Sequence, residues 1–288
     1  HQRLALRDKG RQAESYPHQL VMTATPIPRT LAMTAYADLD ISVIDELPPG
    51  RTPVTTAVIP DTRRGEIVSR VHAACLEDRQ VYWVCTLIDE SEHLECQAAE
   101  DTATELQTAL PDIKVGLVHG RLKPKEKKQV MQAFKQGDID LLVATTVIEV
   151  GVDVPNASLM VIDNAERLGL AQLHQLRGRV GRGNVESHCV LMYHAPLSEN
   201  GQSRLSCLRD TNDGFQIAQR DLELRGPGEL LGTRQTGLPQ FRVADLMADQ
   251  DLLSLMAEAA NQLMTNTPEL AEPLVARWFG DKAYLGQV

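Results

Sequence analysis

Short runs of β-branched and other apolar residues alternate with longer amphipathic stretches between about residues 55 and 195. The runs have the length of strands, and the stretches between them repeat their apolar positions with the period of an α-helix. The pattern predicts strands at 56–59, 81–85, 115–118, 141–144, 159–162 and 189–192, and helices at 64–77, 98–110, 124–134 and 170–177. Strands that alternate with helices form a parallel sheet covered on both faces, so the sequence predicts an α/β fold.

The pattern changes on both sides of this region. Residues 21–24 predict a strand that enters a proline-rich turn, and 47–53 has the composition of a linker. One strand cannot form a domain, so we expect 1–45 to belong to a domain whose main body lies upstream. A linker at 46–55 and the α/β domain at 56–195 then follow.

Beyond Pro196 the strands stop. Residues 202–208 and 215–222 predict two short helices, a glycine-rich loop follows, and 243–279 is predicted to be helical. We therefore expect a helical hairpin with its loop at 196–245 and a helical tail at 246–288.

Composition excludes several classes of protein. The chain is 43% hydrophobic and 24% charged, which is ordinary for a globular protein. Its longest apolar run, 81–88, is far shorter than the roughly 18 residues of a membrane span. The five cysteines are odd in number and form no C-x-x-C pair, which argues against a disulfide framework and a zinc site. We expect reduced cysteines, no bound metal among them, no membrane contact and a cytoplasmic location.

The net charge of −10 weighs against bulk electrostatic attraction to DNA. Any nucleic-acid binding would therefore depend on local patches of positive charge and on backbone amides.

One segment at the end of the predicted helix 170–177 concentrates glycine and arginine. Residues 172–183 read QLHQLRGRVGRG. Arginine presents a planar donor fork that suits phosphate oxygens, and glycine lets the backbone approach a ligand closely. Arg179 and Arg182 can both point at one triphosphate, where such a residue is worth roughly 10³–10⁵ in rate. The alternative is a solvated basic turn at a helix C-terminus, which we disfavour.

A second segment, 144–155, reads ATTVIEVGVDVP. A buried strand ends at Thr145 and Thr146, and the turn that follows contains Gly151 and Asp153. Ligands of open α/β sheets bind at the carboxyl ends of strands. Hydroxyls and backbone amides there can hold a phosphodiester without reading bases, and Asp153 can accept a hydrogen bond from a ribose. An ordinary turn, with Asp153 bonded within its own loop, is an equal alternative on this motif alone.

Together the two segments resemble the fifth and sixth signature motifs of superfamily 2 helicases. Residues 23–30 (TATPIPRT) look like the third motif, and 116–121 (GLVHGR) resemble a loop that contacts a DNA backbone. Residues 204–235 are similar to the TRG motif shared by RecG helicases and the transcription-repair coupling factor. The run 221–237 (DLELRGPGELLGTRQTG) is closer to the RecG form at Pro227, Thr233 and Arg234. The resemblance covers almost the whole chain, and it points to the RecG family of bacterial ATP-dependent DNA helicases.

This resemblance implies a RecA-like second motor domain, preceded by a remnant of the first motor domain and followed by a helical C-terminal extension. It also implies roles for individual residues: catalysis by Arg179, Arg182 and Gln175; nucleotide binding by Asp153 and Gly151; coupling by Thr23, Ala24 and Thr25; DNA contacts by Thr145, Thr146, Glu149, His119, Gly120 and Arg121; and translocation through Arg204, Arg225 and Gln235.

The resemblance further implies ATP and Mg²⁺ as cofactors, with their ligands mainly upstream. The implied partners are branched double-stranded DNA (forks and Holliday junctions), the upstream motor and wedge domains, and a single-strand-binding protein. No heptad pattern is present, so a monomer is expected.

Two motifs of the family are not found. The sequence contains no G-x-x-x-x-G-K-[ST] loop for ATP phosphates and no acidic box for magnesium, both of which lie upstream in the family. The chain alone is therefore expected to be inactive. A coupling-factor-like translocase and a non-catalytic DNA-binding module are the alternative interpretations.

Overall fold

The structure is a computed structural model of the 288-residue chain. It describes residues 51–86, 92–145, 154–183, 185–225 and 252–279, together with positions 9, 18, 20, 22, 42–44, 46 and 249. The chain forms two compact units, one of Ile41–Leu224 and the other of His1–Asp40 with Arg225–Val288.

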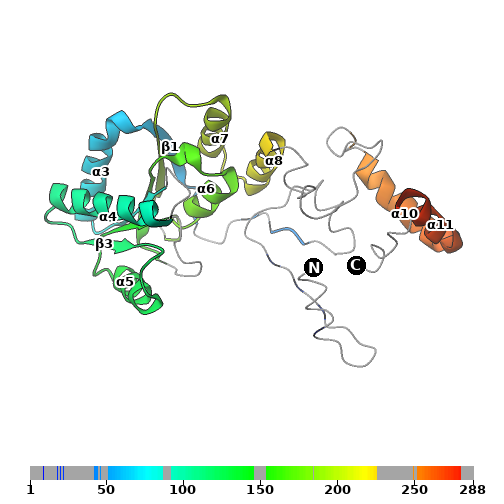
Figure 1. The fold of residues 1–288 in the computed structure, drawn as a ribbon, viewed down its shortest axis with the longest axis horizontal. Coiled ribbons are helices and arrows are strands. Elements are labelled where there is room, and N and C mark those ends of the chain that lie inside the picture. Colours follow the sequence, from blue (N-terminus) through cyan, green and yellow to red (C-terminus); the bar gives the residue numbers. More distant parts are fainter. Residues whose placement is uncertain are drawn as a thin grey trace. The chain divides into compact units, whose positions relative to one another are not determined.

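The first unit is built on a six-stranded sheet (Figure 1). Its strands are β1 (Thr55–Pro60), β2 (Gln80–Cys85), β3 (Val115–Val118), β4 (Leu141–Thr145), β5 (Ala157–Ile162) and β6 (His188–Tyr193). The spatial order is β1-β6-β5-β2-β4-β3, and every pair of neighbours is parallel. Parallel strands need crossover connections, which explains why helices separate them along the chain.

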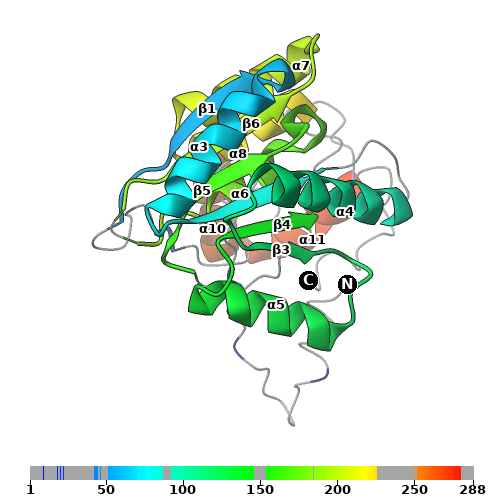
Figure 2. The same cartoon turned by 90° about the vertical axis from the view of Figure 1, so that its left-hand side faces the viewer.

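Helices cover both faces of the sheet. They are α3 (Arg64–Leu76), α4 (Glu92–Ala109), α5 (Pro124–Gln136), α6 (Leu170–Arg177) and α7 (Glu199–Asp210). The chain moves along the sheet in one direction from β1 to β3 and returns from β3 to β6. Because crossovers are right-handed, helices of the outward path cover one face and those of the return path cover the other. Figure 2 shows α4 and α5 on opposite sides of β3 and β4.

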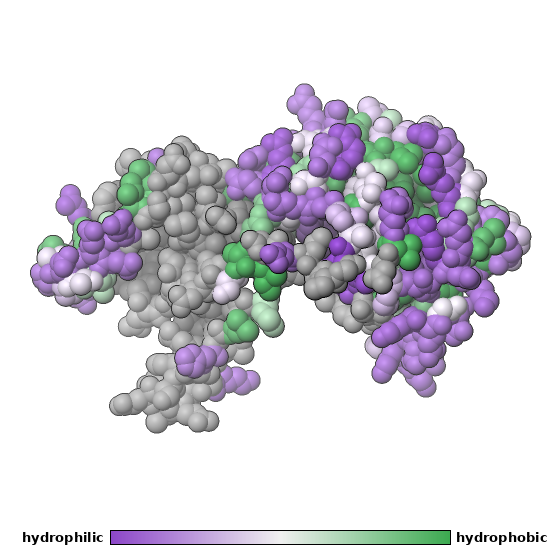
Figure 3. All heavy atoms as spheres, turned by 180° about the vertical axis from the view of Figure 1, so that it is seen from behind, coloured by the Kyte–Doolittle hydropathy of each residue, from purple (hydrophilic) through white to green (hydrophobic). Residues whose placement is uncertain are grey.

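Side chains that alternate along the strands point to opposite faces of the sheet and belong to two separate hydrophobic clusters. Trp83 and Val143 pack with α3 and α4, whereas Tyr82 and Leu142 pack with α5, α6 and α7. Residues of β2, β4 and β5 are buried on both faces, which is the reason these strands read as continuous apolar runs. Figure 3 shows hydrophilic side chains over most of the described surface in that view.

The predicted α/β fold is confirmed, and all six predicted strands are present within two residues of their expected bounds. Helix α6 has the predicted ends. Helix α4 begins at Glu92, six residues before the predicted start at Ala98. Its first turns are rich in polar residues, so apolar periodicity could not reveal them. The strand predicted at 21–24 lies outside the described residues, except for position 22.

All five cysteines are free thiols. Burial raises the pKa of Cys75, Cys85 and Cys189 to about 12. These thiols are therefore held protonated and act as small apolar residues of the core.

After β6 the chain forms α7 and then α8 (Gly214–Arg225). Leu205 and Leu208 of α7 and Ile217 of α8 join the cluster on the α5–α6 face of the sheet. The predicted hairpin helices are thus present, and both pack on the six-stranded sheet.

The described part of the second unit consists of α10 (Leu253–Asn266), a 3-10 turn (Pro268–Leu270) and α11 (Ala271–Phe279). The helical tail predicted at 243–279 is therefore interrupted at Pro268, whose ring blocks continuation of a helix. Within the described ranges, no helix is both long and apolar enough to cross a membrane.

Candidate nucleotide and nucleic-acid sites

The glycine- and arginine-rich segment lies at the amino edge of the sheet, where the strands begin. Helix α6 starts after β5 and buries Leu170, Leu173 and Leu176. It ends at Arg177, and residues 178–183, which we call the arginine loop, then pass the residues that precede β1 and β5. Thr52 and Val54 approach Gly181, and Pro155 approaches Gly183. The arginine loop therefore packs against the residues that lead into β1 and β5.

Backbone contacts hold the arginine loop in one shape. Arg51, from the linker before β1, donates from Nε to the Gly181 carbonyl at 2.9 Å and from Nη2 to the Gly178 carbonyl at 3.4 Å. Gly181 has φ +75°, and a Cβ there would lie 2.8 Å from Cγ2 of Val54. Only glycine fits both this backbone conformation and this space. A Cβ at Gly183 would overlap the carbonyl oxygen of Pro155.

Arg179 and Arg182 are both half-buried in this loop. Burial lowers the pKa of Arg179, and the positive charge of Arg182 lowers it further. Among the described residues, no carboxylate pairs with Arg179. Arg182 donates from Nε to the Gly178 carbonyl at 3.3 Å. Two like charges held close together and partly out of water favour a bound anion, and arginine forks suit phosphate oxygens. Gln175 is exposed on α6.

Arg177 was not predicted as a functional residue, and it differs from its two neighbours. Its side chain is only 3% exposed. Nη1 donates to the carbonyls of Leu208 at 2.6 Å and Thr211 at 3.0 Å, at the C-terminus of α7. It therefore joins helix α6 to the end of α7. The signal was present in the sequence, since residue 177 falls four positions after Leu173, on the buried stripe of α6.

At the opposite, carboxyl edge of the sheet, two predicted DNA contacts lie at the ends of neighbouring strands. Val118 of β3 pairs with Ala144 of β4, so His119 lies beside Thr145. Thr145 is 1% exposed and His119 7% exposed. The Thr145 hydroxyl and His119 Nδ1 are buried and have no hydrogen-bond partner among the described residues, while His119 Nε2 lies 3.4 Å from Oε1 of Glu100. Buried polar atoms are nearly always satisfied, so these two point to a polar ligand at this edge.

Arg121 is exposed on the loop that follows, and the carbonyl of Gly120 accepts a hydrogen bond from Lys127 Nζ at 2.8 Å. The remaining predicted residues of this edge and of the nucleotide site fall outside the described residues: Thr146, Glu149, Gly151 and Asp153. The same holds for Thr23, Ala24, Thr25 and Gln235, and for the side chain of Arg225.

A buried charged group at the same carboxyl edge went unnoticed in the sequence. Asp163, after β5, accepts hydrogen bonds from Arg64 Nη1 at 3.0 Å and Trp83 Nε1 at 2.7 Å. The Arg64 guanidinium lies 4.7 Å from the centre of the Trp83 ring. Burial raises the pKa of Asp163, and the charge of Arg64 opposes that rise. The group fastens the first turn of α3 to β2 and β5, so we assign it a structural role.

Helix α7 is also held at its middle, by Arg204. Its Nη2 donates to the carbonyl of Glu166, in the turn after β5, at 2.6 Å. Arg220 of α8 donates to Oγ of Ser203 on α7 at 2.8 Å, which closes the hairpin. Arg177 and Arg204 therefore hold α7 at the amino and carboxyl sides of the sheet respectively.

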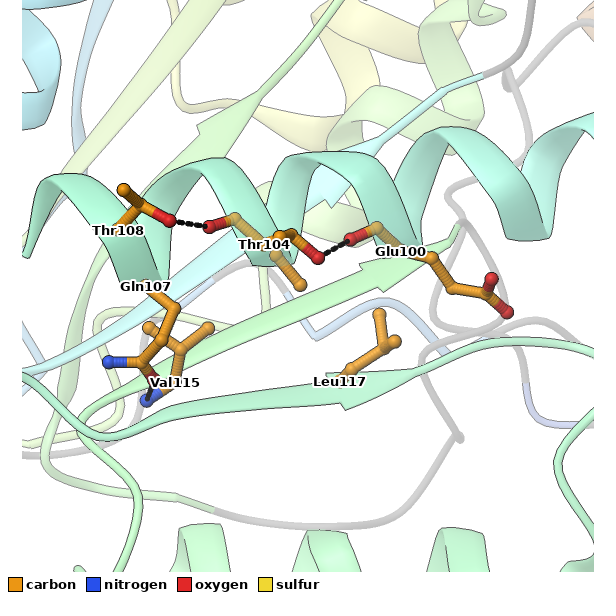
Figure 4. A pocket seen from close by; sticks show the side chains of 7 residues that line it. Glu100, Thr104, Gln107, Thr108, Val115 and Leu117 are labelled. Carbon is orange, nitrogen blue, oxygen red and sulfur yellow. Dashed lines mark hydrogen bonds between the residues drawn. The ribbon is translucent and has the colours of Figure 1, made fainter.

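An open groove of about 410 Å³ lies between α4 and the edge strand β3 (Figure 4). Ala103, Val115 and Leu117 supply its apolar lining. The hydroxyls of Thr104 and Thr108 donate to carbonyls of their own helix, one turn earlier. These two hydroxyls of the groove are therefore already hydrogen-bonded within α4, and the groove does not resemble a reaction site.

The arginine loop fits the phosphates of ATP but not a metal ion. Its donors are guanidinium and amide groups, whereas Mg²⁺ requires oxygen ligands. In the ranges that the structure describes, no group of histidine, cysteine, aspartate or glutamate side chains could hold a metal.

A parallel six-stranded sheet covered by helices on both faces, with an arginine loop after its last crossover helix, has the RecA-like fold of a helicase C-terminal domain. The family model described as helicase conserved C-terminal domain matches residues 66–184. A second model, ATP-dependent DNA helicase RecG, domain 3, C-terminal, matches residues 211–279.

Sequence similarity to known proteins extends along nearly the whole chain. The ATP-dependent DNA helicase RecG of Escherichia coli (strain K12) is 69% identical over 96% of this chain and 40% of its own length. RecG of Pasteurella multocida is 65% identical over 98% of the chain and 41% of its own length. A solved structure of RecG bound to a three-way DNA junction is 47% identical and matches with a TM-score of 0.64, over 80% of this chain and 30% of that one. The chain belongs to the RecG family, and it spans about 40% of the length of these curated relatives.

Proposed function

We propose that this chain is the C-terminal part of an ATP-driven translocase on double-stranded DNA, which unwinds and reverses forks and branch-migrates Holliday junctions. The observation that carries the proposal is the arginine loop, which holds Arg179 and Arg182 half-buried with no carboxylate beside Arg179 among the described residues. The similarity to RecG, including a solved RecG on a three-way junction, supports the substrate. The RecG-specific match at 211–279 favours this function over that of a coupling factor.

Arg179 and Arg182 would meet the γ-phosphate of ATP held by an upstream motor domain of the same protein. Bound ATP supplies the free energy of the cycle, and Mg²⁺ bound to upstream carboxylates would neutralise phosphate charge. The two guanidiniums stabilise negative charge that develops during hydrolysis, in a site that burial partly shields from water. Gln175, Gly151 and Asp153 would orient the nucleotide and the arginines.

The carboxyl edge of the sheet would contact the DNA backbone. Thr145, His119 and Arg121 present a hydroxyl, an imidazole and a guanidinium there, and Gly120, Thr146 and Glu149 would complete the contact. Groups of this kind bind phosphate and sugar, so the protein would bind duplexes with little base specificity.

Coupling between the two edges would pass through α7. Arg177 leads directly into the arginine loop and holds one end of α7, and Arg204 holds the part nearer the carboxyl edge. A shift of the arginine loop on ATP binding would therefore move the hairpin, and with it Arg225 and Gln235. Thr23, Ala24 and Thr25 would couple the upstream domain to the same movement.

Replacement of Arg179 tests the nucleotide role. In the longer protein that carries the phosphate-binding loop, Arg179→Ala should lower DNA-stimulated ATP turnover by about 10³–10⁵, with ATP affinity changed only a few-fold. The exposed Arg209→Ala on α7 is the matched control and should leave turnover unchanged. Turnover of Arg179→Ala within tenfold of wild type would refute the role.

Replacement of Arg204 tests the hairpin. Arg204→Ala should leave ATP turnover nearly intact and abolish fork unwinding, because the motor would cycle without moving α7. If both turnover and unwinding survive, residues 196–245 form a structural cap, and translocation belongs to the motor domains alone. An unfolding midpoint measured beside both assays shows whether the variant is folded.

A further inference from the structure

Positive charge is concentrated in one short region of an acidic chain. Between Lys114 and Lys135 there are seven lysine and arginine residues and one acidic residue, although the whole chain has a net charge of −10. Lys123, Lys125 and Lys128 are exposed at the start of α5. Among the described residues none of the three takes part in an ion pair. We call these three residues the lysine patch.

The lysine patch is placed where it opposes the stability of its own helix. The N-terminus of a helix carries partial positive charge, so lysines in the first turn are unfavourable there. Lys125 and Lys128 are three residues apart on one face, and like charges at that spacing repel. The single acid, Glu126, accepts a hydrogen bond from the Lys123 amide at 2.9 Å and so serves the helix start. Lys135 lies in the last turn, where positive charge is favourable.

Packing does not require these lysines. Helix α5 attaches to the sheet through Met131 and Phe134, and Lys127 is bonded to the Gly120 carbonyl. Figure 3 is seen from behind, and hydrophilic side chains cover its lower right, which is the mirrored place of α5 at the lower left of Figure 1. A charge arrangement that costs stability and supports no packing indicates a ligand that compensates it.

The position of the lysine patch identifies the kind of ligand. Residues 119–123 connect β3 to α5, so the patch continues from His119, whose buried Nδ1 has no partner in the part of the chain that the structure describes, and from the exposed Arg121. Neighbours three apart on a helix have Cβ atoms about 5–6 Å apart, and both can therefore reach phosphates of one strand. Exposed lysines bind phosphates as point charges without base contacts.

We propose that the lysine patch binds the phosphate backbone of double-stranded DNA, beyond the contacts made at the carboxyl edge by Thr145 and Arg121. This inference rests on the proposed function and adds a second contact surface to it. The patch contributes affinity that falls steeply with salt, and it contributes no sequence preference.

The test compares variants of the 288-residue chain by fluorescence anisotropy with a labelled duplex across a salt series. Lys125→Gln/Lys128→Gln should weaken binding by about tenfold or more at low salt, and should make the slope of log affinity against log salt shallower by about 1–2. Lys135→Gln, at the other end of the same helix, is the matched control and should bind as wild type. Arg121→Ala reports separately on the carboxyl edge.

Thermal unfolding of the same variants separates a binding role from a structural one. Lys125→Gln/Lys128→Gln should raise the unfolding midpoint by about 1–4 °C, because an unfavourable charge leaves the first turn and the repulsion between the two lysines is removed. Lys135→Gln should leave the midpoint unchanged or lower it slightly. A fall in the midpoint of the double variant would mean that the lysines support the fold, which overturns the argument for a ligand.

The binding results distinguish failure of the lysine patch from failure of the proposed function. If Arg121→Ala weakens binding while the double variant binds as wild type, the lysine patch is excluded and the proposed function stands. If wild type shows no salt-dependent duplex binding, both the patch and the proposed DNA contact at the carboxyl edge are wrong. If the double variant loses affinity only for an acidic peptide such as polyglutamate, the surface serves a protein segment and the inference fails.

Discussion

Gly181 lies between two arginines, and its own role is purely geometric. Its φ of +75° belongs to the left-handed region, and the side chain of Val54 fills the space where a Cβ would stand. The arginine loop therefore takes its shape from a glycine and from the Arg51 hydrogen bonds, while Arg179 and Arg182 supply its charge. Gly137, at the C-terminus of α5, has a similar φ of +82° with nothing near its missing Cβ.

The two glycines allow backbone strain to be separated from steric overlap. Gly137→Ala should lower the free energy of unfolding by about 1–2 kcal/mol, the cost of a left-handed alanine. Gly181→Ala should cost about 2–4 kcal/mol, because its Cβ would also displace Val54. Urea denaturation of both variants, and of Gly181→Ala combined with Val54→Ala, measures the difference. Equal costs at the two positions would contradict the contact with Val54.

His174, in helix α6, makes the stability of the protein depend on pH. Burial lowers its pKa, and repulsion from Arg177, whose Nη2 lies 3.4 Å from His174 Nδ1, lowers it further. In the unfolded chain histidine titrates near about 6.5, so on acidification the unfolded state takes up this proton first. Stability is therefore lost as the pH falls from about 6.5 towards the lower pKa of the folded state.

We expect the free energy of unfolding to fall less between pH 7 and pH 5 in His174→Gln than in wild type. The measurement is urea denaturation at a series of pH values. His18→Gln, at an exposed position, controls for the loss of a histidine as such. A steeper pH dependence in His174→Gln than in wild type would show that the imidazole is stabilised in its charged form.

Helix α7 is held in place by hydrogen bonds at both of its ends and at its middle. Its N-terminus is capped by Ser198, whose Oγ accepts a hydrogen bond from the Gly201 amide at 3.1 Å. Its C-terminal carbonyls are taken by Arg177, and its middle is held by Arg204. Helix ends need such partners, because their backbone groups have none within the helix.

Removal of the cap should loosen α7 from its N-terminus. Ser198→Ala should lower the free energy of unfolding by about 1 kcal/mol and speed hydrogen exchange of the Gly201 amide. Ser206→Ala, within the same helix, should be neutral or slightly stabilising, because alanine has the higher helix propensity. Equal effects of the two substitutions would show that the Ser198 hydroxyl does not act as a cap.

For the whole molecule, charge and motifs together predict an incomplete ATP site. The arginine loop offers cations to a triphosphate, but the sequence contains no G-x-x-x-x-G-K-[ST] loop that would bind its phosphates. We expect the 288-residue chain alone to release no phosphate from ATP, with or without duplex DNA. A longer protein that includes the phosphate-binding loop is the positive control in the same assay. DNA-stimulated turnover by the 288-residue chain alone would contradict the division of the site between two domains.

The sequence alone predicted the strands and most of the helices. Buried parallel strands are nearly continuous apolar runs, and α6 repeats its apolar residues at helical spacing, so local pattern was sufficient for both. Pro268 was an available signal for the break between α10 and α11, and it was overlooked. The polar start of α4 at Glu92 left no apolar pattern to detect.

The sequence by itself determined the α/β class, the resemblance to RecG and the arginine-rich motif, because periodicity and motif spacing are local properties of a chain. Only the tertiary structure decided the order of the strands, and it placed the arginine loop and the Thr145–His119 pair at opposite edges of the sheet. It also separated three arginines that look alike in sequence. Arg177 faces the end of α7, whereas Arg179 and Arg182 lie half-buried in the loop. The burial and partners of a side chain depend on segments distant in sequence, which local pattern does not encode.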